Sequence, residues 1–266
     1  MKFLKILIPI SILSLVFIFD YYNKYYKPNT SFDDESIFLY VVKDDSLAFR
    51  DSISKYIKSE KTFYKVARRL KYIENKKTGR FKINKGLGNN DIVNSLKFNN
   101  TPVNVTFNNQ ERIENLAGRV SKQIYEDSLS LISAFKDQEF LKKNGLNEKN
   151  VLSIFIPNSY NIYWNTSSED FRDRMLEEYK KFWNKERTKK AEELGLSKLD
   201  IISLASIVQI ESRRNDERPR VAGLYINRIK KNMRLQADPT VIYTIKDYYK
   251  NFDTIIRRVL YRDLKL

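Results

Sequence analysis

The 266-residue sequence contains no cysteine and no histidine. Without cysteine the chain has no disulfide, thiolate nucleophile, iron–sulfur cluster or zinc-thiolate site. Without histidine, Ser-His-Asp triads, histidine acid–base catalysis and most transition-metal sites are excluded as well. Any enzyme chemistry must therefore depend mainly on carboxylates, lysine, tyrosine or serine, and we expect neither a metal nor another cofactor.

Acidic residues are few relative to basic ones. The 33 aspartates and glutamates are outnumbered by 49 lysines and arginines, which gives a net charge of +16. Such a charge favours acidic partners such as anionic lipid, nucleic acid or a carboxylate-bearing polymer, and does not choose among them. The hydrophobic content of 42% is sufficient to fill the core of one large domain or two modest ones.

The longest apolar run lies at the N-terminus. It covers residues 6–19 and follows Lys2 and Lys5. No small-residue cleavage site follows it, which favours an uncleaved signal anchor over a cleaved signal peptide. Counted from Phe3, the run is near the lower limit of about 17 residues for a membrane span. We predict a transmembrane helix at 1–22 with a cytoplasmic N-terminus and an exported remainder, a buried core helix being the alternative.

The hydrophobic periodicity predicts an α+β fold. Strands are expected at 36–42, 79–83, 102–107 and 151–157. Helices are expected at 46–57 and 62–73, and another is expected to begin at an Asn90 cap. Further helices are expected over most of 111–145 and in a long amphipathic segment that ends at Gly195. The second strand, the helix that begins at Asn90 and the third strand are expected to form one small strand–helix–strand unit.

One glutamate, Glu211, lies in the apolar helical run at 201–212. On a helix, Ile207 and Leu204 lie one and two turns before it on the same side. A carboxyl group beside apolar side chains loses hydration, which raises its pKa, as a general acid at neutral pH requires. The alternative is a structural glutamate that forms an ion pair with one of four arginines. These are Arg213, Arg214, Arg218 and Arg228.

Polar side chains follow Glu211 within a short block. They are Asn227, Arg228, Gln236, Asp238 and Thr240. Amides, one acid and a hydroxyl suit hydrogen bonding to a neutral polyhydroxylated ligand such as a sugar. The alternative is that they are capping and turn residues, which have a similar composition.

The segment "LASIVQIES…DERPRVAGLYINRIKKNMRLQADPTVIY" (204–243) resembles the signature of the MltG (YceG-like) family of endolytic murein transglycosylases. In that family a helix of the type "ASIVxxE" carries the catalytic glutamate, so the resemblance assigns catalysis to Glu211. "IFIPNSYNIYW" and "RMLEEYKKFW" resemble the preceding family segment, and residues 78–107 resemble its small LysM-like subdomain. The resemblance implies a linker and LysM-like subdomain at 23–107 and a mostly helical catalytic transglycosylase domain at 108–266.

The family reaction is a lyase reaction that cleaves the β-1,4 bond between N-acetylmuramic acid and N-acetylglucosamine. It acts within peptidoglycan strands and leaves 1,6-anhydro ends, in cell wall synthesis and remodelling. The resemblance implies that one carboxylate acts in turn as acid and base, where ordinary glycosidases use two. It implies that the polar block after Glu211 binds substrate. It also implies a catalytic domain on the periplasmic side of the inner membrane, with peptidoglycan synthesis proteins as candidate partners.

Two features depart from the family pattern. Gln209 stands where the family often has a glutamate, which suggests that a second acid is dispensable there. The sequence also ends at "YRDLKL", before a segment that normally completes the domain. We therefore expect a catalytic domain whose C-terminal part is missing.

Three other functions remain open. A hydrolytic muramidase would need a second carboxylate, for which Glu217 or Asp238 is the candidate. A non-catalytic peptidoglycan-binding membrane protein would bind through the LysM-like subdomain and cleave nothing. Nucleic-acid binding would fit the net charge, but no recognition motif supports it and the expected exported topology argues against it.

Overall fold

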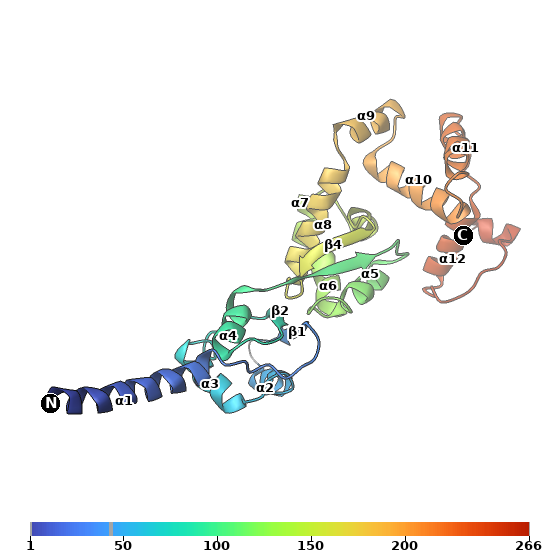
Figure 1. The fold of residues 1–266 in the computed structure, drawn as a ribbon. Helices are drawn as coiled ribbons and strands as arrows, with labels where there is room; N and C mark the ends of the chain where they lie inside the picture. Colours follow the sequence, from blue (N-terminus) through green and yellow to red (C-terminus); the bar gives the residue numbers. More distant parts are fainter. Residues whose placement is uncertain (1, 43–44, 266) are drawn as a thin grey trace. The chain divides into compact units, whose positions relative to one another are not determined.

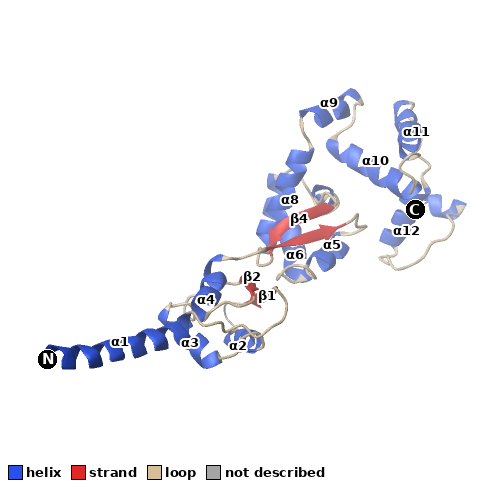
Figure 2. Ribbon diagram, viewed as in Figure 1, coloured by secondary structure: helices blue, strands red, loops and turns tan. Residues whose placement is uncertain are grey.

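The computed structural model describes residues 2–42 and 45–265. The chain divides into two compact units, one of residues 1–147 and 156–174, the other of residues 148–155 and 175–266. The first unit contains two separate antiparallel sheets of two strands each (Figure 2). Their strands are β1 (Ser36–Val41) with β2 (Gly79–Asn84), and β3 (Pro102–Phe107) with β4 (Asn158–Tyr163). Together with the many helices, this confirms the predicted α+β class.

The sheet of β1 and β2 carries the first hydrophobic core. Leu39 is opposite Phe81 in the antiparallel register, and both side chains are buried. Alternation of apolar and polar residues places them on one face of the sheet. The helices α2 (Ser46–Ser54), α3 (Glu60–Arg69) and α4 (Asn89–Phe98) add to the same core. Their buried side chains include Phe49, Ile53, Phe63, Ala67, Ile92 and Leu96.

The sheet of β3 and β4 follows the same alternation. Val105 is opposite Tyr160, and the ring of Phe107 lies 5.5 Å from the Tyr160 ring. These side chains and Ile162 are buried. Helix α5 contacts β3, and α5 contacts α6. The helices in this region are α5 (Ile113–Val120), α6 (Ser128–Phe135), α7 (Gln138–Lys143) and α8 (Ser168–Phe182).

The second unit is helical. Its elements are a 3-10 turn η1 (Val151–Ile154), α9 (Lys185–Glu193), α10 (Lys198–Glu211), α11 (Arg218–Lys230), α12 (Asp238–Tyr248) and η2 (Tyr261–Lys265). Helix α10 begins at a capping box: the Ser197 hydroxyl accepts from the Asp200 amide at 3.1 Å, and the Asp200 carboxylate accepts from the Ser197 amide at 2.9 Å. This pairing satisfies two amide donors at the start of the helix and fixes where it begins.

Several sequence predictions are confirmed and others are wrong. Strands are present at three of the predicted places, and positive φ angles at Gly145 and Gly195 match the expected helix ends. Residues 151–157 contain a 3-10 turn instead of a strand, because the alternation that pairs with β3 starts at Asn158. The predicted order of strand, helix and strand is present as β2, α4 and β3, but β2 and β3 belong to different sheets. The long amphipathic helix is two helices, since Asn184 caps the start of α9.

The predicted membrane anchor is also wrong. Among residues 2–42 and 45–265, no helix is both long and apolar enough to cross a membrane. Helix α1 (Lys2–Tyr25) has 24 residues and contains the segment predicted as the anchor. Its last turns instead contact α3 and α4. The single-pass location predicted for 1–22 thus loses its support.

Buried asparagines connect α1 to the rest of the first unit. The Asn89 amide group donates to the Lys24 carbonyl oxygen at 2.7 Å, and its oxygen accepts from the Asn29 amide group at 2.6 Å. The Asn29 oxygen in turn accepts from the Ser59 backbone amide at 2.8 Å. Asn89 and Asn29 are 1% and 5% exposed, so water cannot replace these bonds.

We expect Asn89→Ala to lower the free energy of unfolding by about 1–3 kcal/mol, because it leaves buried groups of Asn29 and Lys24 unpaired. Urea denaturation measures the change. Asn90→Ala is the matched control on the same helix. Its side chain bonds Asp91 at the surface, so its effect should stay within about 0.5 kcal/mol. Equal effects of the two substitutions would show that the buried network adds nothing.

A second prediction concerns pH and the capping box. Hydrogen bonds from the Ser197 hydroxyl and backbone hold the pKa of Asp200 below its usual range. A lowered folded-state pKa adds stability above the unfolded value of about 3.9, and this stability is lost as pH falls through the folded-state pKa. Asp200→Asn should therefore lower the melting temperature at pH 7 and have little effect near pH 2. Asp253→Asn removes a carboxylate outside any helix and, as the control for loss of charge alone, should change the melting temperature little.

Candidate active site

Helix α10 ends at Glu211, the predicted catalytic residue. The buried face of the helix carries Leu204 and Val208, which are 7% and 6% exposed. Together with Tyr225 of α11 and Ala237 just before α12, they form the core of this region. Helix α10 contacts both α11 and α12 (Figure 1). The core therefore fixes the end of α10, and with it the backbone of Glu211, relative to the other two helices.

The hydroxyl group of Tyr225 interacts with three of the predicted site residues. Burial raises the pKa of the Tyr225 hydroxyl, and so do the negative charge of Glu211 and a hydrogen bond to that carboxylate. The charges of Arg228 and Asp238 act on the same hydroxyl, in opposite directions. The tyrosine is 2% exposed. Three residues that the sequence predicted for the site thus lie within electrostatic reach of one hydroxyl group.

Sequence reasoning missed Tyr225. Its position between Val221, Ala222 and Ile226 in an apolar helix marks it as a core residue, and it does pack in the core. The sequence did offer one indication: a tyrosine buried in a core needs a hydrogen-bond partner for its hydroxyl group. The sequence alone does not show that this partner is Glu211, because the contact joins two helices.

The expected burial of Glu211 is not observed. The side chain is exposed, and Ile210 beside it is 67% exposed. Leu204 is buried and Ile207 partly buried in the core, but Glu211 belongs to the last turn, beyond that core. The desolvation by apolar neighbours that we predicted is therefore wrong for this structure.

The alternative of a structural ion pair is not observed either. Within the part of the chain that the structure describes, no salt bridge involves Glu211. Arg214 pairs with Asp216 at 2.7 Å and with Glu217 at 3.4 Å. Arg218 donates to the Ser212 carbonyl oxygen at 3.2 Å. Arg228 donates to the Leu235 carbonyl oxygen, and Arg213 is exposed.

The two candidates for a second carboxylate differ in their surroundings. Glu217 accepts a hydrogen bond from the Ser212 hydroxyl at 2.9 Å and also pairs with Arg214. These contacts stabilise the turn between α10 and α11. Asp238 is exposed at the first position of α12 and acts electrostatically on Tyr225. Of the two, Asp238 is the one whose charge helps to raise the pKa of the Tyr225 hydroxyl.

The other polar residues of the block have different environments. The Thr240 hydroxyl donates to the Ala237 carbonyl oxygen at 2.7 Å, which stabilises the start of α12. Arg228 stabilises the loop before α12 through Leu235. Asn227 and Gln236 are exposed. Gln236 has a φ of 53°, an uncommon backbone conformation for a residue with a side chain.

The comparisons with known proteins agree with the sequence resemblance. The model of the YceG-like family matches residues 48–265. An endolytic murein transglycosylase of Bacillus subtilis is 26% identical over 228 residues, which are 79% of this chain and 61% of that protein. The chain thus spans about three fifths of the length of that relative.

A solved structure shares the fold. It is the crystal structure of a YceG-like protein of Listeria monocytogenes, which matches with a TM-score of 0.53 and 19% sequence identity. The match covers 88% of this chain and 81% of the other. The family match covers most of the chain, including α10, α11 and α12 with the residues described above. The chain therefore belongs to the YceG-like family.

Proposed function

We propose that the protein is an endolytic murein transglycosylase with Glu211 as its catalytic residue. The observation that carries the proposal is the position of Glu211 in the exposed last turn of α10, which the core of Leu204, Val208 and Tyr225 holds in place. It positions one carboxylate, free of ion pairs in the described structure, in a chain without histidine or cysteine. The similarity to an endolytic murein transglycosylase of Bacillus subtilis supports the same class of reaction.

In the proposed mechanism, protonated Glu211 donates its proton to the glycosidic oxygen between N-acetylmuramic acid and N-acetylglucosamine. The bond from the muramyl C1 to that oxygen breaks. The C6 hydroxyl of the same muramyl residue forms a bond to C1 and gives its proton to the Glu211 carboxylate. The product is a 1,6-anhydro ring, and the glutamate ends in its starting protonation state. No water molecule is consumed, which separates this reaction from glycoside hydrolysis.

The exposure of Glu211 suits a polymeric substrate. An endolytic enzyme must reach a bond in the middle of a strand, and a carboxylate at an open surface is accessible to one. The bound strand itself would then exclude water from the carboxylate, which replaces the burial that the sequence predicted. Exposed Asn227, Gln236 and Asp238 are proposed to hydrogen-bond sugar hydroxyl and acetamido groups. Arg228 and Thr240 are proposed to act by shaping the loop that presents them.

The proposal also assigns roles to the predicted regions. Residues 108–266 are the proposed catalytic region, and residues 23–107 the proposed linker and LysM-like subdomain, which would bind the glycan strand. Peptidoglycan strands are the proposed substrate. Peptidoglycan synthesis proteins stay candidate partners on the strength of the family resemblance.

We expect Glu211→Gln to abolish the formation of 1,6-anhydro products from purified peptidoglycan, because glutamine cannot give and take a proton. Mass spectrometry of the muropeptides measures this. The melting temperature should change little, since the side chain is exposed and has no salt bridge. Glu217→Gln is the control, a nearby glutamate tied to Ser212, and should keep the product pattern. Anhydro products from the Glu211→Gln variant would refute the assignment.

We expect Tyr225→Phe to lower kcat by about 10- to 100-fold with little change in KM, because the carboxylate loses the hydroxyl that orients it while the core stays filled. Initial rates on glycan strands of defined length measure both constants. Tyr248→Phe, an exposed tyrosine of α12, is the control and should leave both constants unchanged. A Tyr225→Phe variant with wild-type kcat would show that the tyrosine only fills the core.

A hydrolytic muramidase is the second candidate, because Asp238 lies in electrostatic reach of the hydroxyl that bonds Glu211. In that reaction a second carboxylate activates a water molecule, and the products have reducing ends instead of anhydro ends. If the protein is a transglycosylase, Asp238→Asn should slow cleavage about 10- to 1000-fold and leave anhydro ends as the only new ends. Reducing ends that disappear in Asp238→Asn would favour hydrolysis.

A further inference from the structure

The outer face of the β1–β2 sheet is aromatic. Leu39 belongs to the core of the first unit, so Phe38 and Tyr40 on either side of it face the opposite way. They are 38% and 47% exposed. Lys82 and Arg80 are opposite them on β2 and belong to the same face. This face thus combines two aromatic rings with two cations, while α2, α3 and α4 pack against the other side of the sheet.

Two further rings extend this face. The ring centroid of Trp164, which follows β4, lies 4.9 Å from that of Tyr40, and the Tyr125 ring lies 5.1 Å from the Trp164 ring. Tyr125 is 48% exposed, and Trp164 is partly buried. All these residues belong to the first compact unit. We call Phe38, Tyr40, Trp164 and Tyr125 the aromatic surface.

Hydrogen bonds fix these rings relative to one another. The Tyr125 backbone amide donates to the Trp164 carbonyl oxygen at 2.8 Å. The Asn100 side chain accepts from the Arg80 backbone amide at 3.1 Å and donates to the Asn165 side chain at 3.0 Å. These two bonds connect β2 to the segment after β4. A preformed surface of this kind loses little conformational entropy when it binds a ligand.

The geometry of the aromatic surface suits sugar rings. The face of an aromatic ring is slightly negative and attracts the weakly positive C–H bonds of a sugar. The rings of Tyr40 and Trp164 meet at 69°, and those of Tyr125 and Trp164 at 57°, so neither pair is stacked face to face. Phe38 and Tyr40 are about 7 Å apart along one strand, so the surface can contact more than one sugar.

The two cations differ in what holds them. The guanidinium group of Arg80 lies 3.6 Å from the centre of the Phe38 ring and donates to the Pro102 carbonyl oxygen at 2.6 Å. Lys82 is exposed and forms no salt bridge among the residues that the structure describes. Lys82 is therefore available to a carboxylate beside the sugars. A nucleic acid has a phosphate beside every base, and Lys82 alone does not match that charge.

We propose that the aromatic surface binds a glycan strand of peptidoglycan, with Lys82 beside a carboxylate of the peptide stem. The choice of ligand rests on the proposed function. The surface goes beyond the proposed LysM-like subdomain, because Tyr125 and Trp164 belong to the proposed catalytic region at 108–266. Its residues are all in the first compact unit, whereas Glu211 is in the second, so strand binding and cleavage are separate tasks.

Co-sedimentation of the full chain with insoluble peptidoglycan tests the proposal. Glu211→Gln is present in every protein, so that binding is measured without the proposed cleavage. We expect Tyr40→Ala/Tyr125→Ala to weaken binding about 10- to 100-fold, because two ring faces are lost. Tyr40→Phe/Tyr125→Phe keeps both rings and should bind within about twofold of the parent protein.

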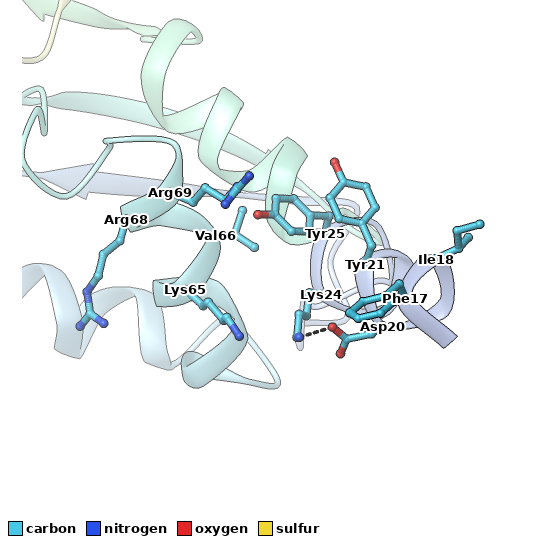
Figure 3. A pocket seen from close by; sticks show the side chains of 10 residues that line it. All are labelled: Phe17, Ile18, Asp20, Tyr21, Lys24, Tyr25, Lys65, Val66, Arg68 and Arg69. Atoms are coloured by element: carbon cyan, nitrogen blue, oxygen red, sulfur yellow. Dashed lines mark hydrogen bonds and ion pairs between the residues drawn. The ribbon is translucent and has the colours of Figure 1, made fainter. Parts of the chain in front are cut away.

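The matched control removes two tyrosines elsewhere. Tyr21 and Tyr22 of α1 are as exposed as Tyr40 and Tyr125, and the Tyr21 ring stacks on another tyrosine of α1 at 4.4 Å (Figure 3). Tyr21→Ala/Tyr22→Ala should change binding less than about twofold, since these rings lie outside the aromatic surface. Melting temperatures of all variants check that each has folded.

The role of Lys82 is tested by the presence of the peptides. Lys82→Gln should weaken binding to intact peptidoglycan about threefold, because one exposed ion pair is lost. Soluble glycan strands without peptides, used as competitors, should bind the Lys82→Gln protein and its parent equally well. Lys65→Gln removes an exposed lysine of α3 (Figure 3) and should leave both kinds of binding unchanged.

Four outcomes would overturn the proposal. Unchanged binding of the Tyr40→Ala/Tyr125→Ala protein would remove the surface from recognition, and an equal loss in the Tyr21→Ala/Tyr22→Ala protein would mean that it has no special role. An equal loss in the phenylalanine variant would mean that hydroxyl groups bind and ring faces do not. Displacement by micromolar single-stranded DNA would mean that the surface binds nucleic acid. Failure of the proposed function is seen separately, as anhydro products formed by the Glu211→Gln protein.

Discussion

The burial of Tyr225 between α10 and the start of α12 is the constraint on which the candidate site depends. The ring is 2% exposed and completes a small core with Leu204, Val208 and Ala237. Because the ring is packed in this core, its hydroxyl is held where the charge of Glu211 acts on it. A packing interaction thereby sets the position of a polar group beside Glu211.

The remaining features of the site follow from the two ends of α10. The capping box of Ser197 and Asp200 determines where the helix begins, and Ser212, in an extended conformation, ends it directly after Glu211. The carboxylate is therefore in the last turn, outside the core, and open to a large ligand. Ser212, Arg214 and Glu217 bond one another in the following turn, so Glu211 is left without an ion pair in the described structure.

The sequence predicted local structure better than contacts between helices. Strands β1, β2 and β3 follow from alternation, and Glu211 was singled out by its apolar run and by the family block. The predicted burial of Glu211 is wrong, because helix periodicity shows which side chains are neighbours within one helix. It does not show which other parts of the chain cover the end of that helix. Tyr225 was missed for the same reason. The sequence predicts the fourth strand seven residues too early, at 151–157, because "VLSIFIP" is more apolar than the segment that pairs with β3.

A double-mutant cycle between Glu211→Ala and Tyr225→Phe, measured by urea denaturation at pH 7, tests the central contact most directly. The account predicts that the two substitutions are not additive, with a coupling free energy of about 0.5–2 kcal/mol, because the charged acceptor and its donor lose the same hydrogen bond. Additive effects would contradict the account, since Tyr225 would then pack in the core without holding the carboxylate.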